Sequence, residues 1–258
     1  MNHEIIKKRA LCLMVAAGTV CTMSAQAQLE EILVTATKRA ESLQDVPMAV
    51  SAMDGESLNN AGIQTMEDIT RQIPVLEVQQ NTSAVATTFR IRRVGNLSNI
   101  PSFEPAVGVF VDGAFRGRAI FGATEMFDVE RVEVLRGPQS TLYGKNATAG
   151  VIGIFTATPG DEFEFKAELT GGVYEGGDGD APLFRFKGGI SGPLTENLSG
   201  SLGLSYVQHD ELLGNAVIGG GEDGNEMDRY AVRGQLSWDM SEDLNARLPL
   251  LPRSNSLW

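Results

Sequence analysis

Side chains that carry acid–base or metal chemistry are few in this sequence, and they are not grouped as enzyme sites require. The two histidines, His3 and His209, lie far apart, and no HExxH, CxxC or GxSxG pattern is present. Acidic residues at 178–180 and 222–223 lack the ordered ligand spacing of a calcium loop, so we expect solvated loop tips there. The sequence therefore predicts no catalytic centre, no metal site and no cofactor.

A glycine-containing stretch at 135–146 (LRGPQSTLYGKN) invites comparison with a phosphate-binding loop. Its glycines, Gly137 and Gly144, are too far apart for that motif, and Asn146 replaces the hydroxyl residue that should follow the lysine. We instead expect Gly137-Pro138 to end a strand in a turn. Gly144 is expected to allow close backbone packing.

Charged side chains are concentrated between positions 90 and 145. The basic ones are Arg90, Arg92, Arg93, Arg116, Arg118, Arg131, Arg136 and Lys145, and the acidic ones are Glu104, Asp112, Asp128, Glu130 and Glu133. They have two interpretations: local pairs on solvated faces, or ion pairs to a neighbouring wall of strands, some of them touching a ligand. Surface pairs contribute about 0–1 kcal/mol, so such pairs would position a domain more than stabilise it. The net charge of −12 argues against binding of nucleic acid, which needs a basic surface.

The N-terminus has the pattern of a secretory signal peptide, residues 1–27. A basic start at 7–9 precedes the apolar run 10–20, and Ala25-Gln26-Ala27 matches a cleavage site, which predicts a mature start at Gln28. An amphipathic or buried N-terminal helix is the alternative. Both cysteines, at 12 and 21, would leave with the leader, so we expect no disulfide, and neither fits a lipid-anchor pattern.

Residues 41–159 mix helical and strand patterns, which predicts a compact α/β domain of roughly 120 residues. The helices are expected at 56–61 and 65–73, the second stopped by Pro74. The strands are expected at 48–52, 76–79, 89–93, 107–111, 129–135 and 151–157. Asp112-Gly113 is a hairpin signal after the fourth of these strands.

Residues 160–246 alternate apolar and polar side chains with a period of two. Phe163, Phe165 and Leu169 share one face of the first strand, and Glu164 and Lys166 share the other. Short connections at 192–197 and 239–243 alternate with longer ones at 175–182 and 209–228. Strands of about ten residues with this loop asymmetry favour antiparallel transmembrane strands. A water-soluble β-sandwich, whose strands also alternate, is the alternative.

The segment 28–40 precedes the α/β domain and holds a short alternating run. Its residues are Glu31, Ile32, Leu33, Val34, Thr35, Ala36 and Thr37. Such a run is able to be extended without belonging to a core, and to add as a strand to the sheet edge of another protein. Taken alone, such a run is more often a linker or an ordinary strand, but its place between the leader and the α/β domain favours the strand-addition role.

Three stretches resemble the TonB-dependent receptors. Residues 31–39 resemble the TonB box, residues 107–118 resemble a plug segment, and residues 128–150 (DVERVEVLRGPQSTLYGKNATAG) are similar to the most specific plug signature. The resemblance covers about 30–238. It implies an α/β plug domain with a mixed sheet, followed by the first antiparallel strands of a 22-stranded barrel in the cell outer membrane. It also implies import of a scarce nutrient, energised by TonB with ExbB–ExbD.

The resemblance also implies roles for particular residues. Residues Glu31 to Thr37 would bind TonB. Plug-signature or plug–barrel contact residues would be Arg90, Arg92, Arg116, Glu130, Arg131, Glu133, Arg136, Gly137, Tyr143 and Gly144. The chain departs from the family pattern at Arg93, where glycine is common, and at Gly153, where asparagine is usual. The nutrient stays open between ferric siderophore, cobalamin, haem and carbohydrate.

The strand pattern weakens after residue 246, and prolines at 249 and 252 stand where a fifth strand should begin. We therefore expect residues 247–258 to be an aberrant tail and the barrel to be unfinished. Four strands alone would leave unpaired edges in lipid, so they cannot form a complete barrel. A frameshift near 245–248 or an incomplete gene record would explain why the remaining strands are missing. A soluble periplasmic binding protein and a nonfunctional receptor remnant remain alternatives.

Overall fold

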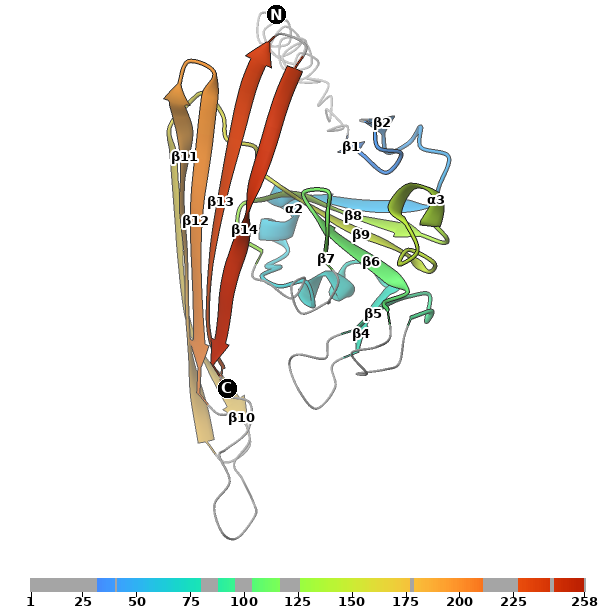
Figure 1. The fold of residues 1–258 in the computed structure, drawn as a ribbon. Coiled ribbons are helices and arrows are strands. Elements are labelled where there is room, and N and C mark those ends of the chain that lie inside the picture. Colours follow the sequence, from blue (N-terminus) through green and yellow to red (C-terminus); the bar gives the residue numbers. More distant parts are fainter. Residues whose placement is uncertain are drawn as a thin grey trace, which may run out of the picture. The chain divides into compact units, whose positions relative to one another are not determined.

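The computed structural model describes residues 32–39, 41–79, 88–95, 104–116, 126–176, 179–210, 227–241 and 244–257 (Figure 1). The expected signal peptide, Glu31, Arg118 and most of the longest expected loop lie outside the described residues. We call residues 41–159 the plug, after the expectation above. The five strands that follow it are called the wall.

The plug is built around a five-stranded mixed sheet with the order β3-β8-β9-β6-β7. Its strands are β3 (Val50–Asp54), β6 (Val107–Val111), β7 (Ala114–Arg116), β8 (Val129–Arg136) and β9 (Gly150–Thr156). Only β6 and β9 run parallel, and the other pairs are antiparallel. The β6–β7 hairpin turns at Asp112-Gly113, as predicted, with both residues at positive φ.

Short elements complete this region: β1 (Leu33–Val34), β2 (Glu41–Ser42), α2 (Gly55–Asn60), the 3₁₀ helix η1 (Asp68–Arg71), β4 (Leu76–Gln79), β5 (Thr88–Ile91) and α3 (Ser140–Tyr143). The Asp54 side chain caps α2 by accepting from the Ser57 N–H. In the described part of the chain, no helix combines the length and apolar character that crossing a membrane would need.

Strand alternation buries both faces of the plug sheet. On one face, Val132 and Ile152 join a cluster with Leu58 and Ile69. The opposite face carries a second cluster that includes Leu135. Because adjacent strand residues point to opposite faces, a run such as VERVEVLR supplies apolar groups to both clusters. Each fully buried side chain of this kind stabilises the fold by about 1.5–3 kcal/mol.

Two expectations for the plug were wrong in extent. The helix expected at 65–73 is only the single 3₁₀ turn η1, because Asp68 accepts from the Thr65 N–H and hydroxyl and fixes a local turn before Pro74 ends the run. The strand expected at 89–93 ends at Ile91. Arg92 and Arg93 then form a two-residue turn in which Ile91 and Val94 exchange main-chain hydrogen bonds.

This turn contains Arg93, one of the two positions at which the sequence departs from the family pattern. Arg92 and Arg93 have φ of 52° and 65°, which glycine adopts more easily than arginine. The turn is therefore made with arginine and carries backbone strain. The other departure, Gly153, lies inside β9 and pairs with Phe110 and Glu133, so no turn is affected there.

The wall is an antiparallel sheet with strands in sequence order. Its strands are β10 (Glu164–Gly176), β11 (Gly179–Thr195), β12 (Leu198–His209), β13 (Met227–Ser241) and β14 (Leu244–Leu257). The predicted alternation is confirmed: Phe165 and Leu169 are 68% and 69% exposed, whereas the polar Lys187, Gln235 and Ser237 on the other face are buried. One face of the wall is therefore apolar and uncovered.

The expectation that no fifth strand begins at 247–258 was wrong, since β14 continues to Leu257 and pairs with β13 along its length. An aberrant origin of the tail stays a prediction. Two features accommodate the prolines. β14 is an edge strand of the described sheet, so Pro249 needs to supply no hydrogen bond outward. A register shift lies between the pairs Val232↔Arg253 and Gly234↔Leu250, which places Pro252 in the bulge.

Candidate functional site

The run expected to bind TonB is folded onto the plug, and we call residues 32–38 the docked segment. Its strand β1 pairs antiparallel with β2. Val34 and Ala36 are fully buried and pack in the cluster that contains Phe110 and Leu135. The run is able to extend without a core, but in this structure two of its residues pack in one. Alternate residues of the run point to one side, and the plug sheet offers an apolar surface to receive them.

A single buried carboxylate holds the centre of the docked segment. The Oε1 atom of Glu133 accepts from the Thr35 N–H at 2.9 Å, from the Thr35 hydroxyl at 3.3 Å and from the Arg131 Nε at 2.9 Å. Arg131 also donates to the Thr35 hydroxyl at 3.2 Å. A buried carboxylate is tolerated only when it is paired and hydrogen-bonded, so Glu133 depends on these donors.

Tyr143, at the end of α3, holds the next part of the docked segment. Its hydroxyl lies 3.2 Å from the Ala36 carbonyl oxygen and 3.4 Å from that of Thr35. Burial raises the pKa of Tyr143 to about 12, and the negative charge of Glu133 adds to the rise. The phenol therefore stays protonated and able to donate at neutral pH.

Lys38 closes the docked segment in a turn with φ of 66°. Its N–H donates to the Thr35 carbonyl at 2.9 Å, and its ammonium lies 3.9 Å from the centre of the Tyr143 ring. Burial lowers the pKa of Lys38, while Glu133 opposes that shift. The cation therefore lies over the same ring whose hydroxyl holds the segment.

The main-chain groups of the docked segment are largely used within the protein. Leu33 and Val34 pair with β2, the Thr35 N–H meets Glu133, and the Thr35 and Ala36 carbonyls meet Tyr143. Strand addition by another protein relies on such main-chain groups. The docked form and a form paired with another sheet therefore compete for the same donors and acceptors.

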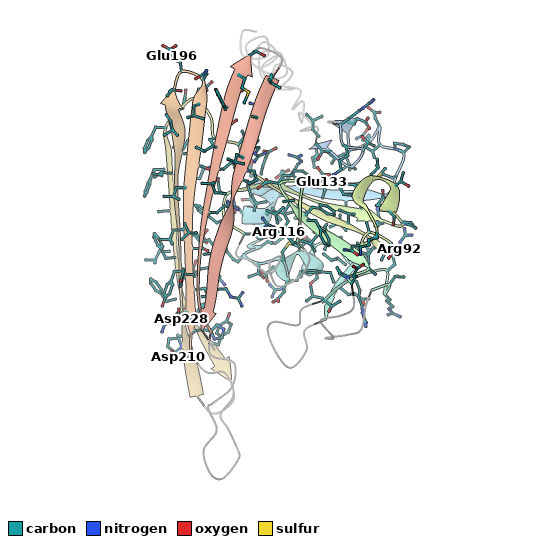
Figure 2. All side chains as sticks on the ribbon, viewed as in Figure 1. Arg92, Arg116, Glu133, Glu196, Asp210 and Asp228 are labelled. Atoms are coloured by element: carbon teal, nitrogen blue, oxygen red, sulfur yellow. The ribbon has the colours of Figure 1, made fainter. Side chains whose placement is uncertain are left out.

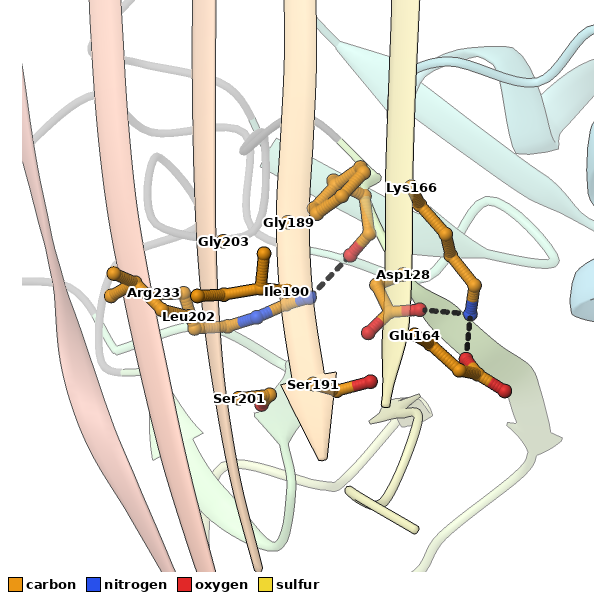
Figure 3. Close-up of a pocket in the computed structure, with 11 residues that line it drawn as sticks. Asp128, Glu164, Lys166, Gly189, Ile190, Ser191, Ser201, Leu202, Gly203 and Arg233 are labelled. Carbon is orange, nitrogen blue, oxygen red and sulfur yellow. Dashed lines mark hydrogen bonds and ion pairs between the residues drawn. The ribbon is translucent and has the colours of Figure 1, made fainter. Parts of the chain in front are cut away.

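A second contact region joins the plug to the wall (Figure 3). Lys166 on β10 pairs with Asp128 at 2.9 Å. Arg233 on β13 donates to the main-chain carbonyl of Phe127. Lys187 on β11 donates to the Met126 carbonyl at 3.3 Å and also to the Gln64 side chain. Cations from three wall strands thus meet one short plug segment.

A further plug–wall contact lies at the β6–β7 turn. Arg247 on β14 donates to the Thr156 carbonyl at 2.5 Å and lies 3.5 Å from the Asp112 carboxylate. The Thr156 hydroxyl lies 3.2 Å from the Gln235 amide of β13. Asp112 also accepts from the Thr156 N–H at 2.8 Å, so the turn, β9 and the wall share one network.

The small pocket at the plug–wall contact is too small for a nutrient. It encloses about 10 Å³ and is lined by residues that include Phe127, Asp128, Ser201 and Arg233. That volume is on the order of one water molecule. Among the described residues, no group of three or more histidine, cysteine, aspartate or glutamate side chains is arranged to hold a metal ion.

The residues expected as plug signature or plug–barrel contacts are dispersed. Figure 2 marks Glu133, Arg116 and Arg92 on different parts of the plug. The structure brings Arg131, Glu133 and Tyr143 together at the docked segment, with Glu130 paired to Arg131 at 2.5 Å.

Among the described residues, the rest of that set makes no hydrogen bond or ion pair with the docked segment. The Arg136 Nε lies 3.4 Å from the Ala49 carbonyl. Gly137 and Gly144 turn the chain at φ of 91° and 84°. Arg90 lies in β5, Arg92 in the turn that follows it, and Arg116 ends β7.

Asp112 and Asp128 belong to the charged set for which ion pairs to a wall of strands were one interpretation, and both make such pairs, with Arg247 and Lys166. Sequence reasoning missed Gln64, Phe127 and Thr156, which also join plug and wall. The contact uses main-chain carbonyls, which leave no signal in the sequence. Gly189 and Gly203 on the wall, where an added Cβ would meet the Phe127 ring, offered a clue, because glycine within a strand often marks the close approach of another segment.

Comparison with known proteins agrees with this architecture. The model of the TonB-dependent receptor plug domain matches residues 42–151. The pesticin receptor of Yersinia pestis is 32% identical over 172 residues, covering 65% of this chain and 24% of that protein. The vitamin B12 transporter BtuB of Photobacterium profundum is 28% identical, covering 67% of this chain and 27% of that protein.

Solved structures give the same result. The ferric yersiniabactin uptake receptor FyuA from Yersinia pestis superposes with a TM-score of 0.62 at 27% identity, over 74% of this chain and 29% of that one. The ferripyoverdine receptor of Pseudomonas aeruginosa, with a TM-score of 0.63 at 20% identity, covers 84% of this chain and 26% of that one, and shares the fold. The chain spans about a quarter of the length of the curated relatives it matches. Residues 42–151 form a TonB-dependent receptor plug domain, and they are followed by strands like those that begin the wall of these receptors.

Proposed function

We propose that this chain supplies the plug and the first wall strands of an outer-membrane receptor that imports a scarce nutrient with energy from TonB. The docked segment, residues 32–38, is its TonB-binding segment, with ExbB–ExbD driving TonB. The observation that carries this proposal is the way the plug holds the segment. Glu133 and Tyr143 occupy main-chain groups that strand addition to TonB would use.

The names of the relatives support a choice of nutrient class to test. Proteins similar to this chain are named as a ferric yersiniabactin uptake receptor and a vitamin B12 transporter. A metal chelate, and first of all a ferric siderophore, is therefore the substrate class to test. Cobalamin is the second candidate. Growth of cells that depend on this receptor, with each chelate as the sole source of iron or cobalamin, distinguishes the two.

The wall supports placement in a membrane. Large apolar side chains such as Phe165, Leu169 and Leu202 are exposed on one face, and they would meet lipid in the outer membrane. Cell fractionation tests this directly. Recovery of the protein in the osmotic-shock extract, rather than in the outer-membrane fraction, would contradict the proposal.

The coupling role is tested by binding of the purified TonB periplasmic domain to the receptor. Val34→Pro removes a main-chain N–H and should abolish strand pairing. Val34→Ala keeps the N–H and shortens a buried side chain, so it separates main-chain pairing from side-chain packing. We expect binding by Val34→Ala at least as tight as by the wild type, because strand addition tolerates varied side chains. Equal binding by Val34→Pro would rule out this coupling segment.

A further inference from the structure

Three consecutive plug residues, Met126 to Asp128, meet cations from three wall strands; Figure 3 shows two of these cations, Lys166 and Arg233. Arg233 donates to the Phe127 carbonyl, Lys187 to the Met126 carbonyl, and Lys166 pairs with Asp128. Two of these three acceptors are main-chain oxygens. The wall therefore binds mainly the backbone of this segment. These hydrogen bonds depend on the path of the backbone more than on the types of the side chains.

The ring of Phe127 occupies a slot made by two wall glycines. Gly189 on β11 and Gly203 on β12 are directly paired in the sheet. A Cβ atom at position 189 would lie 2.7 Å from the Phe127 ring, and one at position 203 would lie 3.1 Å from it. Because real Cβ atoms essentially never come within 3.0 Å of a neighbour, a larger residue at 189 would displace the ring, and one at 203 would press on it at a tighter than usual contact. The slot thus sets the position of the segment along the strands.

This segment leads directly into the strand that holds the docked segment. β8 begins at Val129, next to Asp128, and carries Glu133 further along. Glu133 bonds the N–H and hydroxyl of Thr35. A pull on the docked segment therefore reaches β8 at Glu133, while the beginning of the same strand is held by the wall.

We propose that Met126–Asp128 is the anchor of the plug, and that it stays seated in the wall while TonB detaches the docked segment. Phe127 is its positioning residue, through the slot of Gly189 and Gly203. This inference rests on the proposed function, because it requires TonB to act on the docked segment. It goes further by assigning the part of the plug that does not move.

The test follows two single-cysteine receptors in cells that contain energised TonB. The sequence has cysteines only at positions 12 and 21, within the expected leader. Ser201→Cys places a thiol in the pocket beneath the anchor, and Thr37→Cys places one in the docked segment. Labelling by a small maleimide is measured with the proton gradient intact and after a protonophore collapses it.

We expect energised TonB to raise labelling of Thr37→Cys by about fivefold or more, because the docked segment opens locally. Labelling of Ser201→Cys should stay the same, within about twofold, under both conditions. Added to Ser201→Cys, Phe127→Ala should raise labelling under both conditions, and Phe127→Leu should restore slow labelling by refilling the slot.

A pair of wall variants checks the slot without changing the plug. Gly203→Ala, which crowds the Phe127 ring, should raise labelling of Ser201→Cys. Gly171→Ala is the matched control, since a Cβ added there meets nothing within 4 Å. It should leave labelling unchanged.

Three results would overturn the anchor. A rise at Ser201→Cys with energised TonB would show that the anchor moves, while leaving the coupling role of the docked segment intact. Unchanged labelling after both Phe127→Ala and Gly203→Ala would remove Phe127 as the positioning residue. If Thr37→Cys itself did not respond to the proton gradient, the proposed function would fail, and the anchor with it.

Discussion

One carboxylate oxygen of Glu133 accepts from both the main-chain N–H and the hydroxyl of Thr35, across a sequence separation of 98 residues. Glu133 is fully buried in the plug sheet, and Thr35 lies at the centre of the segment that we assign to TonB. Glu133 therefore gives the docked segment one buried polar contact next to an apolar cluster. Any partner that pairs with the Thr35 backbone must first displace this carboxylate.

Removing the Thr35 hydroxyl should favour the TonB-bound form. Thr35→Val keeps the shape of the side chain but loses the contacts to Glu133 and Arg131. Because a hydrogen bond to a charged group contributes about 1.5–3 kcal/mol, we expect TonB to bind about tenfold more tightly. Titration calorimetry with the TonB periplasmic domain measures this change.

Thr37→Val is the matched control for that measurement. The Thr37 hydroxyl is buried and has no hydrogen-bond partner among the described residues, so its loss removes no contact. TonB affinity should not rise, because removing an unsatisfied buried hydroxyl does not weaken the docked form. A larger effect of Thr37→Val than of Thr35→Val would contradict the role of Glu133.

The two carboxylates that pair with Arg131 should contribute unequally to stability. Glu133→Gln removes the charge of a buried pair whose side chains are 1% and 15% exposed, and should lower the free energy of unfolding by about 3 kcal/mol. Glu130→Gln removes a pair whose carboxylate is 47% exposed, and should cost about 0–1 kcal/mol. Urea unfolding of the two variants measures the difference. Equal losses of unfolding free energy would contradict a larger contribution from the buried Glu133–Arg131 pair.

The docked segment should weaken at high pH through Tyr143. Its pKa is raised to about 12 in the folded protein from 10.0, so the folded state binds this proton more tightly than the unfolded state. The resulting stabilisation is complete below about pH 10 and is lost as the pH rises to about 12. Absorbance of tyrosinate, compared between wild type and Tyr143→Phe, should assign a titration near pH 12 to Tyr143. A midpoint close to 10 for that residue would exclude the buried phenol.

The arginine turn after β5 should become more stable with glycine. Arg93 has φ of 65°, and its ion pair with Glu77 is largely exposed. Arg93→Gly relieves the left-handed backbone and should raise the free energy of unfolding by about 0.5–1 kcal/mol. Arg136→Gly, in the ordinary strand backbone of β8, should lower it. Thermal unfolding compares the two, and a loss in both variants would show that the turn is not strained.

The sequence predicted much of the plug and wall because their signals are local. The bounds of β6 follow from an apolar run that ends at turn residues, and those of β4 from a short alternating run, LEVQ. The hairpin at Asp112-Gly113 follows from the dipeptide itself. The alternating faces of β10 to β13 follow from the period of two. The plug signature at 128–150 is specific enough to indicate the family from the order of its residues alone.

The strand that continues after residue 246 could not be predicted from the local sequence. Pro249 and Pro252 weaken the strand signal, but β13 offers a long edge for pairing, and a bulge takes up the second proline. Strand formation there is decided by the neighbouring strand. No window of the sequence around 247–258 contains that information.

The contacts at the candidate sites depend on tertiary structure more than the strands and turns do. The sequence by itself determined that residues 31–37 are able to extend, that 128–150 carries a plug signature and that the wall strands have an apolar face. Only the fold decided that Thr35 meets Glu133, and that Phe127 lies between Gly189 and Gly203. The physical reason is that these contacts join positions far apart in the chain. Several of them also end on main-chain atoms, which every residue carries and which no pattern of side chains reveals.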